Sequence, residues 1–345
     1  YVTSISSLPA LVSQNFTWEK VGTINVGLDV NLFNNRLSGV FEWYQRNTNG
    51  MLAPGVQLPA VVGASAPYQN TADMRTRGWE LSLNWRDQIG KVGYRIGFNL
   101  SDYKSEIIKY DDNAATKLLS SYYPGQTLGE IWGYVVDGYY TVDDFVDTSS
   151  WQLKEGVTSI NGYNVRPGDV KFKNLRDDDT STNVITSGDN TFDNPGDRKV
   201  IGNTTPRYQY GINLGMNYAG FDLNVILQGT GKRDYWISNV LTFPMNGDNF
   251  VPLFEGLSDY WMPKDPDNGD WSAVNPNAKY PRIYGNRGNS GSNLRQSDKY
   301  LSDASYLRIK NITLSYKLPK KWVNQIFLNQ MKAFVSIENV ATFTS

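Results

Sequence analysis

Apolar and polar residues alternate with a period of two along much of this chain. Between Thr23 and Phe33, one face carries aliphatic side chains, and the other carries polar residues or glycine. The aliphatic residues are Ile24, Val26, Leu28, Val30 and Leu32. This alternation predicts a β-strand with one polar and one apolar face. Asn34 and Asn35 tolerate positive φ, so they predict a tight turn into a strand over 36–46.

The same pattern predicts about eight strands in total. Hairpins are expected over 78–101, with a connection near Gly90, and over 207–229, with a turn at Ala219-Gly220. Single strands are expected over 306–317 and 332–340. In the 306–317 strand the apolar face switches between Ile309 and Ile312, which predicts a β-bulge.

Short and long connections alternate between these predicted strands. The long segments cover roughly 48–76, 103–205 and 231–304. Structureless connections of this length are uncommon in compact domains. Transmembrane β-barrels, in contrast, have short periplasmic turns at one end and longer extracellular loops at the other. The spacing therefore favours an all-β, antiparallel transmembrane barrel with long extracellular loops.

The order of side chains along one apolar face supports the same prediction. Over 208–218, tyrosines stand at both ends and aliphatic residues stand between them: Tyr208 and Tyr210, then Ile212, Leu214 and Met216, then Tyr218. Amphipathic rings prefer the headgroup level of a bilayer, whereas aliphatic side chains prefer its hydrocarbon core. The alternative is a water-soluble β-protein, in which these aliphatic residues would be buried.

Composition excludes several function classes. The 345 residues contain no cysteine and no histidine, which removes disulfides, thiolate chemistry, imidazole zinc sites and Ser-His-Asp catalysis. Lys+Arg is 33 and Asp+Glu is 34, so nothing indicates a nucleic-acid surface. An enzyme would depend on paired carboxylates, as glycosidases do, and no local pairing stands out. No enzyme activity is expected.

Several stretches together resemble a known family. Residues 303–319 read DASYLRIKNITLSYKLP, and 275–282 read NPNAKYPR. Upstream, 70–80 read NTADMRTRGWE and 133–140 read GYVVDGYY. In this order they resemble the signatures of the SusC/RagA group of TonB-dependent outer-membrane transporters. The resemblance extends over nearly the whole chain.

The resemblance implies that residues 1–345 form the C-terminal part of a barrel of about 22 strands. The plug and the earlier strands are absent from this chain. The implied function is import of nutrient oligomers, most readily oligosaccharides, across the bacterial outer membrane. The implied partners are a SusD-like lipoprotein and, through the missing plug region, the TonB complex. Import of peptides and a secreted glycan-binding module remain alternatives.

Ligand contact is expected from aromatic residues of the long connections, whose rings can stack on sugar faces. The selected residues are Trp132, Tyr134, Trp151, Trp236, Trp261 and Trp271. The alternative is that they pack the loops together or contact a lid protein. Asp177 and Asp179 lie in an acidic segment that could hold a structural calcium ion, although a solvated acidic loop is the simpler interpretation. No other cofactor is expected.

Overall fold

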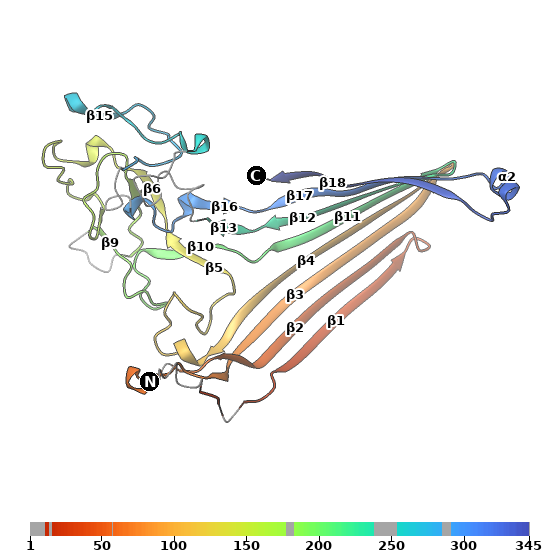
Figure 1. Cartoon of the computed structure of the whole chain (residues 1–345), viewed down its shortest axis with the longest axis horizontal. Coiled ribbons are helices and arrows are strands. Elements are labelled where there is room, and N and C mark those ends of the chain that lie inside the picture. The colour runs from red at the N-terminus through yellow and green to blue at the C-terminus, as the bar shows by residue number, and fades with distance from the viewer. Residues whose placement is uncertain are drawn as a thin grey trace, which may run out of the picture.

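The protein is built on one large antiparallel sheet (Figure 1). The computed structural model describes residues 11–13, 16–56, 58–176, 183–237, 254–284 and 291–344. Eight strands form the sheet in sequential order. They are β1 (Lys20–Leu32), β2 (Leu37–Pro54), β3 (Tyr68–Ile89), β4 (Val92–Tyr110), β11 (Arg207–Tyr218), β12 (Phe221–Lys232), β17 (Tyr306–Lys317) and β18 (Lys332–Thr344).

Shorter elements fill the connections. Two-stranded ladders join β5 (Glu130–Tyr134) to β10 (Arg198–Asn203), β6 (Val136–Tyr139) to β8 (Val170–Phe172), β7 (Ser159–Ile160) to β9 (Val184–Ile185), β13 (Asp234–Trp236) to β16 (Leu301–Asp303), and β14 (Pro263–Asp265) to β15 (Asp270–Ala273). The helical turns are η1 (Ala60–Val62), η2 (Asp111–Asn113), η3 (Val142–Asp144), η4 (Glu255–Leu257), η5 (Pro266–Asn268), η6 (Asp298–Tyr300), α2 (Lys320–Val323) and η7 (Asn324–Ile326). None of the helices among the described residues is both long and apolar enough to cross a membrane.

The predicted strands and turns are confirmed, but several bounds are wrong. β2 continues to Pro54, β3 already begins at Tyr68, and β4 continues to Tyr110. The predicted connection over 48–76 therefore shrinks to 55–67. Register shifts after Thr48 and after Asp73 interrupt the alternation, because an extra residue exchanges the two faces.

The apolar residues form continuous rows across the sheet. One row pairs Leu214 of β11 with Val225 of β12, which then pairs with Ile312 of β17. None of Ile212, Leu214 and Met216 is buried; Leu214 is 38% exposed and Met216 is 47% exposed. Within this chain these side chains are therefore not part of a water-soluble core, as the prediction of a lipid-facing row requires.

The predicted bulge in β17 is confirmed at Lys310. Leu227 pairs with Ile309, and the adjacent Ile226 pairs with Asn311, which leaves Lys310 as the extra residue. Because of this insertion, Ile309 and Ile312 share the apolar face although an odd number of positions separates them. Lys310 Nζ donates a 3.2 Å hydrogen bond to Gln228 Oε1 on the polar face.

The connections lie at opposite ends of the sheet. Tight turns join β1 to β2, β3 to β4 and β11 to β12 at one end, where α2 also projects (Figure 1). The long connections gather at the other end (Figure 1). We call the described residues of 111–206 and 233–305 the loop assembly. It is a folded unit with its own hydrophobic core, rather than the structureless loops that the sequence suggested.

Candidate functional site in the loop assembly and on the polar face

A small aromatic and aliphatic core organises the loop assembly. Its buried members are Tyr134, Tyr140, Phe145, Ile160, Val165, Val170, Phe172 and Ile185. They come from β5 to β9 and the turns between them, which are too short to be stable as isolated ladders. Burial of these side chains therefore holds the strands in place and fixes the surface groups around them.

A buried carboxylate ties distant parts of the loop assembly together. Asp169 is 1% exposed and accepts hydrogen bonds from Tyr284 Oη at 2.6 Å, Asn293 Nδ2 at 2.9 Å and the Arg166 amide at 2.8 Å. Burial raises the pKa of Asp169, and burial beside this carboxylate also raises the pKa of Tyr284. The bonds from Tyr284 and Asn293 link residues more than one hundred positions apart, so they close the assembly.

Aromatic rings and guanidinium groups alternate next to this carboxylate. Trp151 and Trp271 meet edge to face, with centroids 5.1 Å apart. Arg166 lies 5.5 Å from the Trp151 ring, and Arg282 lies 4.9 Å from both the Trp271 and Tyr284 rings. Cations at these distances are attracted to the ring faces. The row presents flat apolar surfaces next to hydrogen-bond donors.

A cleft of about 270 Å³ lies beside the β5–β10 ladder. Its lining includes Trp132, Tyr134, Asn161, Arg198 and Arg295. Arg295 lies 5.3 Å from the Tyr134 ring, and Arg198 is oriented by hydrogen bonds to the 187 and 195 carbonyl groups. One half-exposed indole ring, an amide and two guanidinium groups therefore surround the same space.

The structure places the predicted aromatic residues in three settings. Trp132 and Tyr134 line the cleft, although Tyr134 is only 6% exposed and also belongs to the core. Trp151 and Trp271 form the edge-to-face pair described above; both are partly buried, and Trp151 also packs against the core of the loop assembly. Trp236 packs against the cluster around Leu257, and Trp261 is 2% exposed. Ligand contact by these residues stays a prediction.

Trp261 shows how packing can account for a loop aromatic. Gly168 has φ +90°, and a Cβ atom at this position would overlap the Trp261 ring. The ring therefore occupies the space that a side chain at Gly168 would need. Trp261 holds two long connections together, as the alternative interpretation of the loop aromatics expected.

Sequence reasoning missed the polar partners of the cleft. Asn161, Arg198 and Arg295 are distant in sequence from Trp132 and carry no local motif. Only the tertiary arrangement brings them together. Asp177 and Asp179 lie outside the described residues, so the calcium prediction is not tested. Across the residues that the structure does describe, no three acidic side chains form a metal-binding group.

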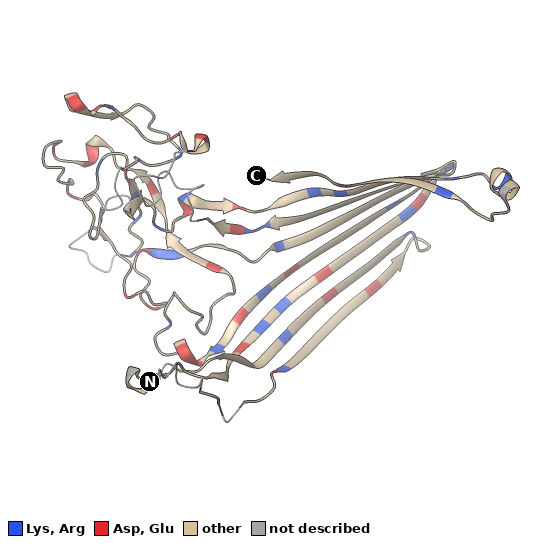
Figure 2. Cartoon of the chain, in the orientation of Figure 1, with Lys and Arg blue, Asp and Glu red and all other residues tan. Residues whose placement is uncertain are grey.

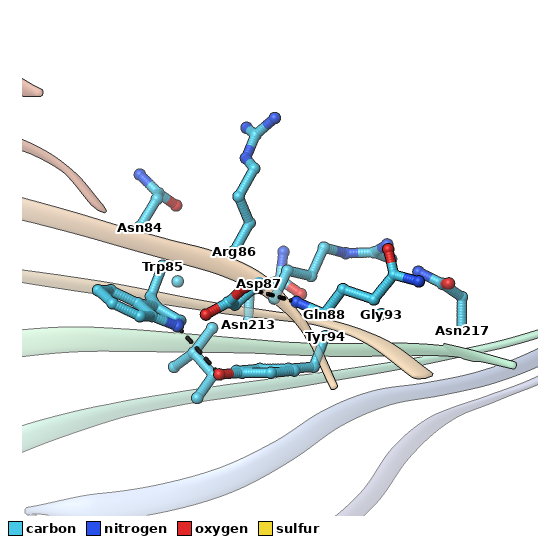
Figure 3. A pocket seen from close by; sticks show the side chains of 12 residues that line it. Asn84, Trp85, Arg86, Asp87, Gln88, Gly93, Tyr94, Asn213 and Asn217 are labelled. Atoms are coloured by element: carbon cyan, nitrogen blue, oxygen red, sulfur yellow. Dashed lines mark hydrogen bonds between the residues drawn. The ribbon is translucent and has the colours of Figure 1, made fainter. Parts of the chain in front are cut away.

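A second hollow lies on the polar face near the turn end of the sheet. It measures about 570 Å³, and Asn84, Arg86, Arg95, Asn213 and Asn217 contribute to its lining. Figure 3 shows Asn84 and Arg86 on one side of β3, with Trp85 and Tyr94 on the other. Arg95 forms a 3.5 Å ion pair with Asp222. This hollow on the polar face is thus lined by amides and cations.

No family model matches the chain. TonB-dependent receptor P3 of Formosa agariphila is 27% identical over 98% of the chain, and TonB-dependent receptor SusC of Bacteroides thetaiotaomicron is 24% identical over 93%. The RagAB peptide importer in its open-open state matches 96% of the chain with a TM-score of 0.68 and 23% identity. The chain spans 28–32% of the length of these proteins.

These similarities and the sheet point to the class: the chain resembles the outer-membrane β-barrel of TonB-dependent receptors. Within that class, the matches to SusC and to the RagAB importer confirm the resemblance drawn from 303–319 and the upstream stretches. Its location is the bacterial outer membrane.

Proposed function

We propose that this chain forms the C-terminal part of the barrel of an importer for nutrient oligomers. The observation that carries the proposal is the division of one sheet into an apolar outer face and a polar inner face, with a folded loop assembly at one end. In this account the plug and about 14 further strands come from elsewhere in a longer protein. Uptake is driven by TonB, which acts through that plug.

Oligosaccharides are the proposed substrates. In the cleft beside β5, Trp132 offers a flat apolar surface, while Asn161, Arg198 and Arg295 offer donors for hydroxyl groups. The partly exposed Trp151–Trp271 pair offers a second surface of the same kind. Few apolar contacts combined with several convergent polar groups suit a neutral, hydroxyl-rich ligand.

A SusD-like lipoprotein is the proposed partner on the extracellular side. SusC/RagA-type chains imply such a lid, and the loop assembly is the surface that it would cover. Half-exposed Trp and Tyr side chains are common at the energetic centres of protein interfaces. The Trp151–Trp271 pair is therefore available either to ligand or to the lid.

Growth of a strain that lacks the corresponding gene tests the function. Loss of growth on particular oligosaccharides, with restoration by the whole gene, is the expected result. Trp132→Ala combined with Asn161→Ala should slow that growth several-fold. The matched control is Trp322→Ala, because Trp322 is an exposed tryptophan in α2 at the other end of the sheet.

Peptide import is the second candidate, because the solved relative is named a peptide importer. If the deletion strain fails to grow on peptides as sole nitrogen source but still uses all glycans, the proposed substrate becomes a peptide instead of an oligosaccharide. Unchanged growth on every glycan and peptide would overturn the import proposal. Recovery of the whole protein in the water-soluble fraction without detergent would also overturn it, and would favour the secreted glycan-binding module.

A further inference from the structure

The outer face of the sheet carries a group of cations just beyond its aromatic residues. Trp43 of β2 pairs with Trp79 of β3 on the apolar face. Two residues farther toward the loop assembly, and therefore on the same face, Arg77 pairs with Lys104 of β4. Arg75 follows two residues later. Figure 2 shows blue segments near the loop ends of β3 and β4. We call Arg75, Arg77 and Lys104 the outer cation group.

The register fixes the depth of this group in the membrane. Trp43 and Trp79 stand at the loop end of the apolar rows, where amphipathic rings meet the headgroup layer. Two strand residues at a tilt of about 40° rise ~5 Å. Arg77 and Lys104 therefore lie about 5 Å beyond the tryptophans, within the headgroup layer of the outer leaflet. Long connections mark this end as extracellular.

Neutral amides orient the two arginines. Arg77 Nε donates a 2.8 Å hydrogen bond to Gln45 Oε1, and Arg75 Nε donates a 3.3 Å hydrogen bond to Asn47 Oδ1. Both amides lie on β2, beside the guanidinium groups that they hold. The bonds use one N–H of each guanidinium and keep its charge. The terminal nitrogens remain available for bidentate contact with phosphate.

Acidic residues do not neutralise the group. Among the described residues, no carboxylate forms an ion pair with Arg75, Arg77 or Lys104. Glu106 shares the face and pairs with Arg75 across the strands, without such a contact. Asp102, the neighbouring acid, is 7% exposed and is held by a bidentate ion pair with Arg207. The face therefore keeps a net positive charge at headgroup level.

We propose that the outer cation group binds the phosphate groups of a glycolipid in the outer leaflet of the outer membrane. Two guanidinium groups and one ammonium group, spread over adjacent strands, suit a headgroup with more than one phosphate. The tryptophans below contact the upper part of its acyl chains. This site is separate from the lumen and from the loop assembly, so it ties the barrel to its membrane and takes no part in substrate capture.

Binding of lipid A to the whole detergent-solubilised protein tests the proposal. The probe is fluorescent lipid A with both phosphates, compared with dephosphorylated lipid A and with millimolar inorganic phosphate. Each basic residue near a charged surface contributes about fivefold in affinity, so Arg77→Gln with Lys104→Gln should weaken binding of the phosphorylated lipid about 25-fold. Arg77→Lys should weaken binding less than Arg77→Gln does, because it keeps the charge but loses the bidentate contact.

The matched control removes two cations from the opposite face. Arg46 pairs with Thr76 on the polar face, and Arg308 there donates a 3.0 Å hydrogen bond to Thr342. Arg46→Gln with Arg308→Gln should leave lipid A binding within about twofold. Circular dichroism and heat-dependent gel mobility check that both variants fold.

Three outcomes would overturn the proposal. They are equal losses in the two double variants, unchanged binding after Arg77→Gln with Lys104→Gln, and equal affinity for phosphorylated and dephosphorylated lipid A. Full competition by millimolar inorganic phosphate would also count against a glycolipid site. The readout is lipid binding, so loss of nutrient uptake in either variant does not affect it.

Discussion

The sheet and the loop assembly are ordered by different physical means. In the sheet, continuous backbone ladders join strands that are consecutive in sequence or are separated by one long connection. No other part of the described chain covers the apolar face of this sheet, so many of its side chains are exposed. In the loop assembly, ladders are only two to six residues long, and order comes from a buried core and the bonds to Asp169. The sheet therefore needs lipid as its solvent, whereas the loop assembly builds its own interior.

The largest expected effect breaks the loop assembly alone. Asp169→Ala leaves Tyr284 Oη, Asn293 Nδ2 and the Arg166 amide without their acceptor. Each buried unsatisfied donor costs ~1–3 kcal/mol, so the assembly should lose about 4 kcal/mol of stability. Hydrogen exchange of residues 130–172 should accelerate while the strands of the sheet keep their protection.

The control for this prediction is Asp147→Ala. Asp147 is exposed, and its hydrogen bonds reach only Ser149 and Ser150 within the same turn, which hold the pKa of its carboxyl below the usual range. Its loss should leave exchange of the assembly unchanged. Equal acceleration in both variants would mean that Asp169 does not close the assembly.

The next effect concerns the two faces of the sheet. Leu214→Arg should cost ~2–4 kcal/mol of folding free energy, because a cation would enter the hydrocarbon region. Asn213→Arg should be tolerated, because this neighbour faces the polar interior. Urea titrations of the whole protein in lipid bilayers measure both. Similar costs at the two positions would contradict the assignment of the faces.

The smallest effect depends on pH. Burial lowers the pKa of Lys299 to about 8 from its usual 10.5, with the ammonium 4.5 Å from the Tyr139 ring. Between pH 8 and 10.5 the unfolded chain binds more protons at this group, so stability rises with pH. Because Lys299 keeps partial solvent contact, a gain of about 1 kcal/mol is expected for the loop assembly between pH 7.5 and 9.5.

Lys299→Met supplies the comparison for the pH prediction. In this variant the loop assembly should have the same thermal stability at pH 7.5 and at pH 9.5. Tryptophan fluorescence monitors the unfolding. Above about pH 10 the comparison ends, because the raised pKa values of Tyr139 and Tyr300 make stability fall as pH rises. A rise in the Lys299→Met variant equal to that of the parent would refute the assignment.

The same contrast explains what the sequence could predict. A period of two and an Asn-Asn or Ala-Gly turn are local signals, so the strands around Asn34 and Ala219 were predictable. The bulge at Lys310 was predictable because the apolar face changes side within one strand. The ends of β2 and β3 were not, because bulges and polar residues on both faces remove the alternation there.

The candidate site was predictable only in part. Trp132 and Trp151 could be chosen as loop aromatics, but their exposure depends on partners far along the chain. Arg198 and Arg295 meet Trp132 only through the β5–β10 ladder and a contact between β5 and residues 296–297. No spacing in the sequence encodes that arrangement. Trp261 shows the converse, since this loop aromatic is 2% exposed and its ring lies against Gly168 of another long connection.

Single cysteines on β11 test most directly whether the apolar face meets lipid. The chain has no cysteine of its own, so Asn213→Cys and Leu214→Cys each introduce one thiol into it. In outer membranes that hold the whole protein, a charged maleimide should label the Asn213→Cys variant but not the Leu214→Cys variant. A lipid-soluble maleimide should label the Leu214→Cys variant. Equal labelling of both positions by the charged reagent would contradict the account.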